Sequence, residues 1–154
     1  MEIFTVSFFG HRELHSLSRY EDILEKHIRD LIQAKEYVDF LVGRDGDFDR
    51  LVSSTIIRCA DKYGYGNTHH ILVLPYMRAE YRDNMDSFLN YYDDVEICSS
   101  SSDAHYKSAI TIRNRDMVDR SDFVIFCAEH EGGAYRTMKY AEKQKKPYIN
   151  IAGL

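Results

Sequence analysis

Short, continuous runs of apolar residues recur along the chain, with longer stretches of helical pattern between them. Runs of this length are typical of strands buried on both faces. The clearest runs are Ile3–Phe9, Val38–Val42, Ile71–Leu74, Phe123–Ala128 and Tyr148–Ile151, and Val95–Cys98 is a weaker candidate. Buried strands that alternate with helices form βαβ units, so the pattern predicts a mainly parallel sheet.

The predicted helices lie between these strands. The sequence Ser18-Arg19-Tyr20-Glu21 fits a capping box at the start of the first helix, whose apolar face continues to Ile32. Further helices are expected over Phe48–Lys62, Glu80–Tyr91, Ala104–Arg120 and Gly133–Lys145. The whole chain, residues 1–154, is therefore predicted to be one α/β domain, a Rossmann-like three-layer sandwich.

Composition and charge restrict the function. A chain of 154 residues with 44% hydrophobic and 29% charged residues has the balance of a globular domain. The formal net charge of −5 argues against general nucleic-acid or anionic-membrane binding, because both need a cationic surface. We therefore expect neither a nucleic-acid nor a membrane partner. A small anionic ligand, held by a few local donors, remains compatible with this charge.

The spacing of the cysteines and the first residues of the chain indicate where in the cell the protein is expected. Cys59, Cys98 and Cys127 are far apart and form no C-x-x-C pair, which indicates reduced thiols and predicts a cytoplasmic location. The start, MEIFTVSFFGHRE, lacks a basic region and a cleavage site, so it is predicted to be a strand and not a signal peptide. No apolar run approaches the roughly 18 residues of a membrane span.

Glycine turns follow three of the predicted strands, where Rossmann-like sheets bind their ligands. They are Gly10-His11-Arg12, Gly43-Arg44-Asp45-Gly46 and Gly132-Gly133. Glycine permits a close backbone approach, arginine offers a fork of donors, and free amides at a helix N-terminus bind anions. The Gly132-Gly133 turn is the strongest phosphate-loop candidate, with the Thr137 hydroxyl as a further donor. For the first turn, a solvated arginine beside a turn glycine is the alternative.

A helix further along the chain carries Arg113, Asn114 and Met117 on one face. These side chains can flank a base or a sugar-phosphate, although a surface salt-bridge ladder is an alternative. In the second glycine turn, Asp49 is expected to bind ribose hydroxyls or to cap a helix.

Several familiar sites are excluded. Asp45, Asp47 and Asp49 alternate as in a calcium loop, but the glycine and glutamate that an EF-hand requires are absent, so no metal is predicted. His69 and His70 begin a strand, at the sheet end opposite the expected site, and are predicted to be structural. Neither G-x-G-x-x-G nor G-x-x-x-x-G-K-[ST] occurs, which disfavours ordinary dehydrogenases and P-loop NTPases.

Together these motifs resemble the SLOG superfamily, most closely its YpsA-like branch. The resemblance keeps motif order over nearly the whole chain and includes Pro75 after the third strand. Its motifs are Gly10-His11-Arg12, the Gly43-to-Asp49 turn, Arg113-Asn114…Met117-Val118…Ser121-Asp122 and Gly132-Gly133…Thr137. The resemblance implies a Rossmann-like fold, with phosphate at the Gly132-Gly133 turn and with Arg113 and Asn114 beside the ribose or its phosphate.

Members of that superfamily include the Lonely Guy phosphoribohydrolases, nucleotide-sensing domains and a DNA-processing protein. The phosphoribohydrolases carry G-G-x-G-T-x-x-E, and Tyr140 stands here in place of the glutamate. A tyrosine with a pKa near 10 is a poor substitute for a carboxylate at neutral pH. The YpsA-like turn G-G-x-x-G-x-D is also altered, with Arg44 and Asp47 at two of its glycines.

The leading hypothesis is therefore a protein that senses or sequesters a nucleotide or a nucleotide-derived ligand, such as an NAD- or ADP-ribose-related compound. No other cofactor is predicted. The residues expected to form the site are Gly10, His11, Arg12, Gly43, Arg44, Asp49, Arg113, Asn114, Met117, Gly132, Gly133 and Thr137.

The alternative is an N-glycosidic hydrolase (phosphoribohydrolase) that acts on nucleoside monophosphates. Its candidate carboxylates are Asp49, Asp116, Asp122 and Glu131. Binding of single-stranded DNA is disfavoured, because the chain is acidic and shows no basic aromatic groove. A homodimer with the tyrosine-rich third helix at its contact is left open.

Overall fold

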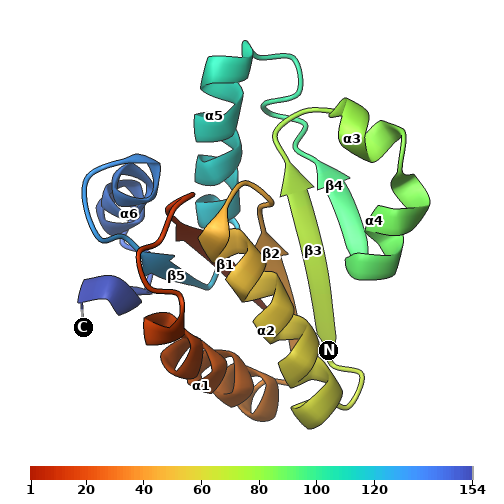
Figure 1. Cartoon of the computed structure of the whole chain (residues 1–154), viewed down its shortest axis with the longest axis vertical. Coiled ribbons are helices and arrows are strands. Elements are labelled where there is room, and N and C mark those ends of the chain that lie inside the picture. The colour runs from red at the N-terminus through yellow and green to blue at the C-terminus, as the bar shows by residue number, and fades with distance from the viewer. Residues whose placement is uncertain (154) are drawn as a thin grey trace.

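The computed structural model describes residues 1–153 and contains a six-stranded sheet with helices on both faces (Figure 1). The strands are β1 (Ile3–Gly10), β2 (Tyr37–Val42), β3 (Thr68–Leu74), β4 (Asp94–Ile97), β5 (Phe123–Cys127) and β6 (Tyr148–Asn150). Their order is β4-β3-β2-β1-β5-β6, and every neighbouring pair is parallel. The predicted Rossmann-like α/β fold is confirmed.

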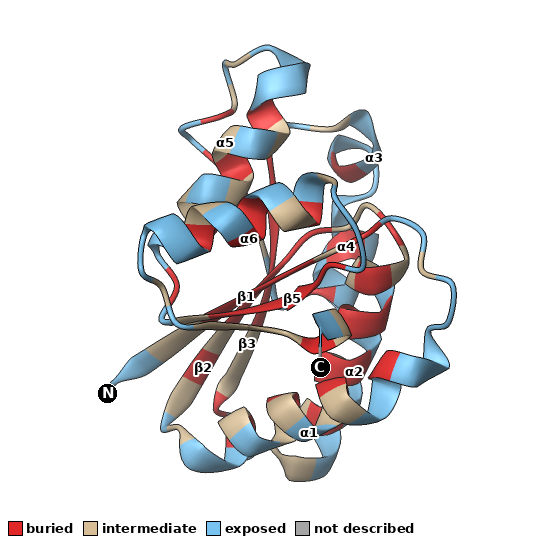
Figure 2. Ribbon diagram, turned by 90° about the vertical axis from the view of Figure 1, so that its left-hand side faces the viewer, coloured by how far each residue is buried: buried red, intermediate tan, exposed pale blue. Residues whose placement is uncertain are grey.

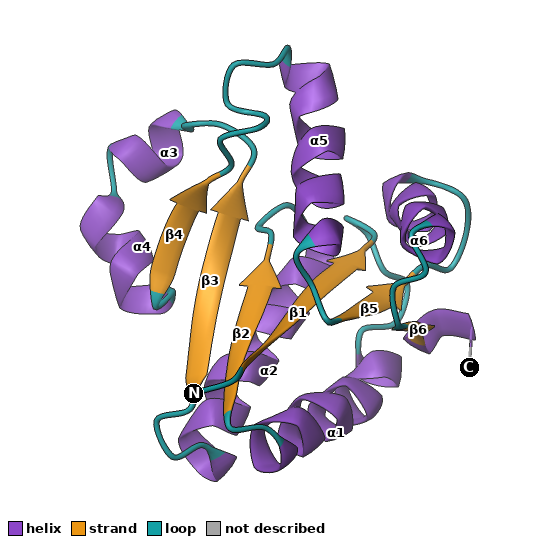
Figure 3. Cartoon of the chain, turned by 180° about the vertical axis from the view of Figure 1, so that it is seen from behind, coloured by secondary structure: helices purple, strands orange, loops and turns teal. Residues whose placement is uncertain are grey.

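The helices form the outer two layers (Figure 3). They are α1 (Ser18–Ala34), α2 (Asp47–Tyr63), α3 (Ala79–Arg82), α4 (Met85–Tyr91), α5 (Tyr106–Asp119) and α6 (Gly133–Lys143), and a 3₁₀ turn spans Ile151–Gly153. Helices α1 and α2 cover one face of the sheet and α5 and α6 cover the other. In the described part of the chain, no helix has the length and apolar character needed to cross a membrane.

Two apolar cores hold the layers together, one on each face of the sheet (Figure 2). Because alternate strand residues point to opposite faces, Phe8 packs towards α1 and α2, while Phe9 packs towards α5 and α6. Full burial of each such side chain contributes about 1.5–3 kcal/mol. The three cysteines are buried and unpaired, and burial raises the pKa of Cys127 to about 12.

The predicted capping box at Ser18 is wrong. Ser18 is already the first helical residue, and Leu17 occupies the N-cap without a side-chain bond. A backbone turn explains the difference, because the Tyr20 amide donates to the Leu17 carbonyl and the Arg19 amide donates to that of Ser16. The N-cap therefore lies one residue before the predicted one, and Ser18 stands inside the first turn of the helix.

The single helix predicted over Glu80–Tyr91 is two helices, α3 and α4. Asn84 separates them, with φ −140° and ψ 37°. Its side-chain amide donates to the Glu80 carbonyl at 2.8 Å, so a local side-chain bond competes with helix continuation. At the other predicted boundaries the structure differs by a few residues, as where β3 starts at Thr68 and β6 ends at Asn150.

Candidate functional site

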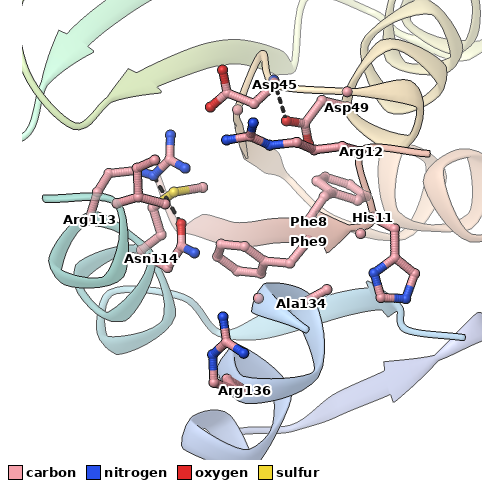
Figure 4. Close-up of a pocket in the computed structure, with 16 residues that line it drawn as sticks. Phe8, Phe9, His11, Arg12, Asp45, Asp49, Arg113, Asn114, Ala134 and Arg136 are labelled. Atoms are coloured by element: carbon pink, nitrogen blue, oxygen red, sulfur yellow. Dashed lines mark hydrogen bonds between the residues drawn. The ribbon is translucent and has the colours of Figure 1, made fainter. Parts of the chain in front are cut away.

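A cavity of about 350 Å³ opens where β1 and β2 end, between α2, α5 and the start of α6 (Figure 4). It is lined by Phe8, Phe9, Gly10, His11, Arg12, Gly43, Asp45, Gly46, Asp49, Ile110, Arg113, Asn114, Met117, Gly133, Ala134 and Arg136. All but three of the residues expected at the site line this cavity. The exceptions are Arg44, Gly132 and Thr137.

Two of the glycines allow the loops to pack against each other. A Cβ atom on Gly10 would lie 2.3 Å from the Phe48 ring, and one on Gly46 would lie 2.3 Å from the Arg12 Cα. The Asp47 amide also donates to the Arg12 carbonyl at 2.8 Å. The loops after β1 and β2 are thus held together at the start of α2, and the glycines there serve the fold of the cavity wall.

The N-terminus of α6 is different, because it opens into the cavity. Gly132 is the N-cap, with no side-chain cap, and the first turn contains no acidic residue. Among residues 1–153, a Cβ atom on Gly133 would meet no atom within 4 Å apart from its chain neighbours and its own helix backbone. Gly133 and Ala134 line the cavity, and among residues 1–153 their amides have no hydrogen-bond acceptor. Such amides, at the positive end of a helix dipole, are suited to an anion.

Two arginines add positive charge. Arg12, from the loop after β1, and Arg136, from the first turn of α6, extend into the cavity from opposite sides (Figure 4). Both are exposed. Within the described residues, neither forms an ion pair. Both guanidinium groups therefore remain free for an anionic ligand.

His11 joins the first and last parts of the site. Its Nε2 accepts the Glu129 amide at 2.8 Å, so the ring proton of the neutral form resides on Nδ1. The ring stacks on His130 with 3.9 Å between centroids. Burial, and then the charge of His130, lower the pKa of His11. The neutral imidazole lines the cavity and presents Nδ1–H as a donor.

The carboxylates of the second loop are engaged within the protein. Asp45 accepts two hydrogen bonds from Arg78, at 2.7 and 3.1 Å. Burial alone would raise the pKa of Asp45, but the bonds and charge of Arg78 outweigh it and lower that pKa. Asp49 accepts the Asp45 amide at 2.8 Å, and burial raises its pKa. Asp49 therefore closes its own loop, and the expected helix cap is not formed, because α2 has no side-chain bond at its N-cap Gly46.

The hydrolase alternative finds little support in this geometry. Of its four candidate carboxylates only Asp49 lines the cavity. Asp122 instead accepts the Thr5 amide at 2.8 Å, close to where β1 starts. Tyr140 donates to Asp119 at 2.7 Å, outside the cavity. The two carboxylates among residues 1–153 that line the cavity already have partners, because Asp45 binds Arg78 and Asp49 binds the Asp45 amide, so neither is free to assist cleavage.

Arg113 lies in the cavity wall and is almost fully buried. Its guanidinium donates to the Val73 carbonyl at 2.8 Å and to the Asn114 side chain at 3.0 Å. Burial lowers the pKa of Arg113. The side chain therefore anchors β3 to α5, and Met117 beside it belongs to the apolar core. Ligand contact by Arg113, Asn114 and Met117 stays a prediction.

The three predicted residues outside the cavity have other contacts. The Thr137 hydroxyl donates to the Gly133 carbonyl at 2.9 Å, so its hydrogen is used within α6. Arg44 turns away to Glu80 and to the hydroxyl of Tyr92, at 3.0 and 3.2 Å. Gly132 packs beside the His11 ring.

Sequence reasoning missed part of the lining: Phe8, Phe9, Asp45, Gly46, Ile110, Ala134 and Arg136. Arg136 had a usable signal, because it stands in the first turn after the glycine pair. The apolar residues had none beyond their place in a strand or helix. In the part of the chain that the structure covers, no group of three potential metal ligands comes together.

No family model and no curated protein matches the sequence. Among solved structures, the fold is similar to that of DNA processing protein A from Helicobacter pylori, which was solved in a study of its single-stranded DNA binding mode. The TM-score is 0.65 at 16% identity, over 94% of this chain and 63% of that one. DNA processing protein A from Streptococcus pneumoniae gives a TM-score of 0.65 at 14% identity, over 95% of this chain and 49% of that one. This chain thus spans less than two thirds of either neighbour.

The comparison corrects two predictions. A small nucleotide-derived ligand was expected and nucleic acid was not, yet the two solved structures named above are of DNA processing proteins, one with a described single-stranded DNA binding mode. The prediction against nucleic acid was wrong because it used the net charge of the whole chain instead of the local charge of the cavity. A value of −5 averages the whole surface, whereas Arg12 and Arg136 in the cavity form no ion pair within 4 Å among residues 1–153, although the charge of Arg12 also acts on Asp45.

Proposed function

We propose that this chain binds single-stranded DNA, with the sugar-phosphate backbone in the cavity at the carboxyl ends of β1 and β2. One observation carries the proposal: Arg12 and Arg136 extend into the cavity from opposite sides, beside the open N-terminus of α6. Phosphodiester groups match these donors in charge and geometry. The described DNA binding of the Helicobacter pylori protein, which shares the fold, supports the proposal.

Membership of the SLOG superfamily is part of the same proposal, supported by the order of the glycine and arginine motifs. A cytoplasmic location also belongs here, since Cys59, Cys98 and Cys127 are buried and unpaired.

The shape of the cavity favours a single strand over a duplex. The donors lie within a concave site of about 350 Å³, and not along a convex ridge. A duplex is stiff, whereas a single strand can bend its backbone into a pocket and splay its bases outward. We therefore expect single-stranded DNA to bind more tightly than a hairpin duplex of equal charge.

The acidic surface implies few phosphate contacts. The chain has 20 basic and 25 acidic side chains, so charge outside the cavity opposes binding. Each phosphate neutralised in a single strand contributes about −0.7 to the slope of log K against log salt. Two or three contacts predict a slope of about −1.5 to −2.

The test is fluorescence anisotropy with a labelled oligothymidine and a hairpin duplex. Loss of one charged hydrogen-bond donor, in Arg12→Ala or Arg136→Ala, should weaken single-strand binding about tenfold. Lys62→Ala, at the far end of α2, removes the same charge and should change binding less than twofold. Equal effects in all three variants, or no binding at low salt, would contradict the proposal.

A further inference from the structure

A second and larger cavity, of about 590 Å³, lies between α2 and the α3–α4 segment. Its lining includes Gly43 and Asp49, which also line the first cavity. The two cavities are therefore neighbours that share one wall, at the loop after β2. A flexible ligand with one group in each cavity would have to pass over this wall, in which Gly43 is buried.

The second cavity is rich in flat surfaces. Phe88, Tyr91 and Tyr92 contribute aromatic rings, of which Phe88 and Tyr92 are buried while Tyr91 is 42% exposed. The Arg44 guanidinium lies over the Phe88 ring, 4.4 Å from its centroid. Aromatic rings and planar guanidinium groups are the surfaces on which nucleobases stack.

Charges in the second cavity are balanced. Arg44 pairs with Glu80 at 3.0 Å, and Arg50 pairs with Asp47 at 2.8 Å. The bonds from Arg44 to Tyr92 and Glu80 outweigh the effect of its burial and raise the pKa of Arg44, which keeps this pair charged. A phosphate would find no unpaired cation here. A neutral, planar group fits this cavity better than the first one, where Arg12 and Arg136 form no ion pair with the described residues.

Polar side chains at the rim of the second cavity can form hydrogen bonds with the edge of a planar ligand. Ser87 presents a hydroxyl from the exposed side of α4. Asn84 uses its amide nitrogen for the Glu80 carbonyl, so its side-chain oxygen remains an acceptor. Donors and acceptors beside a stacking surface are what base edges require.

We infer that the second cavity holds a nucleobase of the same DNA strand whose phosphate lies in the first cavity. The strand crosses over Gly43 and Asp49, and the base stacks against Tyr91. This inference rests on the proposed DNA binding and deepens it, because it divides the site into a phosphate cavity and a base cavity.

The experiment compares an oligothymidine with an oligomer of equal length and charge whose sugars all lack bases. Wild-type protein should bind the intact strand about tenfold more tightly, as expected for one stacked base. Tyr91→Ala removes the stacking surface and Ser87→Trp fills the cavity from an exposed position. Each should reduce the preference to less than threefold. Leu89→Ala, which alters another exposed residue of α4, should retain the full preference.

The outcomes separate this inference from the proposed function. If the base-free strand binds as tightly as the intact one, or if the preference survives in both Tyr91→Ala and Ser87→Trp, the base cavity is refuted. DNA binding then still stands, provided that Arg12→Ala weakens the binding of both strands. If neither strand binds the wild-type protein, the proposed function fails and the inference fails with it.

Discussion

Helices α2 and α6 begin with nearly the same backbone at the same edge of the sheet, yet their N-termini have different surroundings. The N-cap of α2 is Gly46, at φ 167° and ψ −168°, and that of α6 is Gly132, at φ 162° and ψ −163°. The first turn of α2 carries Asp47 and Asp49, whereas that of α6 carries no acid.

Neighbouring groups fill the start of α2 and leave the start of α6 open. The Asp47 amide is bound by the Arg12 carbonyl, and the loop is closed by the bond from Asp45 to Asp49. Around Gly133, the described residues place no atom within 4 Å of an added Cβ apart from its chain neighbours and its own helix backbone. A glycine turn at a strand end therefore does not by itself make an anion site. Its surroundings decide whether the helix amides serve the fold or a ligand.

The strongest test of this contrast compares alanine at the two helix starts. Gly46→Ala would place Cβ 2.3 Å from the Arg12 Cα, a backbone atom that cannot move away alone. Forced overpacking of this kind should lower the free energy of unfolding by about 3 kcal/mol. The methyl group of Gly133→Ala would lie in open space, so this substitution should change the free energy of unfolding by less than about 1 kcal/mol. Urea denaturation measures both, and equal losses would remove the distinction between the two turns.

A carboxylate added to α6 should make it resemble α2. Gly133→Asp places a negative charge in the first turn, where it is compatible with the helix dipole, so stability should be kept or slightly raised. The same charge occupies the anion position, and we expect single-stranded DNA binding to weaken about 30-fold, or about 2 kcal/mol. Anisotropy at constant salt measures this. Gly133→Asn, of the same size without the charge, is the control, and an equal loss there would indicate steric exclusion instead.

The smallest expected effect is on the pH dependence of stability and comes from His11, which connects the loop before α6 to the end of β1. Its pKa is below the ordinary 6.5 because of burial and then His130. Above pH 6.5 both folded and unfolded states are neutral; below it the unfolded state gains a proton that the folded state resists, so stability falls. His11→Gln should lose less stability than wild type between pH 7.5 and 5.5 in urea titrations. His15→Gln, at an exposed position, should follow wild type, and identical pH profiles for all three proteins would contradict the prediction.

Much of the fold could be predicted from the sequence, because its strands are continuous apolar runs. Those runs located β1, β2 and β5 to within one residue at each end. The place of the cavity also followed, since parallel strands bring their carboxyl ends to one edge. The split between α3 and α4 did not follow, because a single Asn84 side-chain bond decides it.

The directions of individual side chains could not be predicted from the sequence. Arg12 and Arg44 both follow strands in glycine turns, and both were expected at the ligand. Arg44 turns away because Glu80 and Tyr92, far along the chain, offer it better partners. Thr137 likewise bonds to its own helix. The error over nucleic acid has a related origin, since net charge says nothing about which cations are left without partners.

The position of β1 has a consequence for synthesis of the protein. Of these six strands, β1 is the first to be synthesised, yet it lies in the middle of the sheet, between β2 and β5. Until residues 123–127 emerge, the apolar Ile3–Gly10 segment has one open hydrogen-bonding edge, which invites pairing with another nascent chain. The hydrogen bond from the Glu129 amide to His11 likewise cannot form until Glu129, 118 residues later, has been synthesised. The nascent domain is thus most exposed to aggregation in the interval before β5 docks, and the cavity is completed only after the first turn of α6, which lines it, has been synthesised.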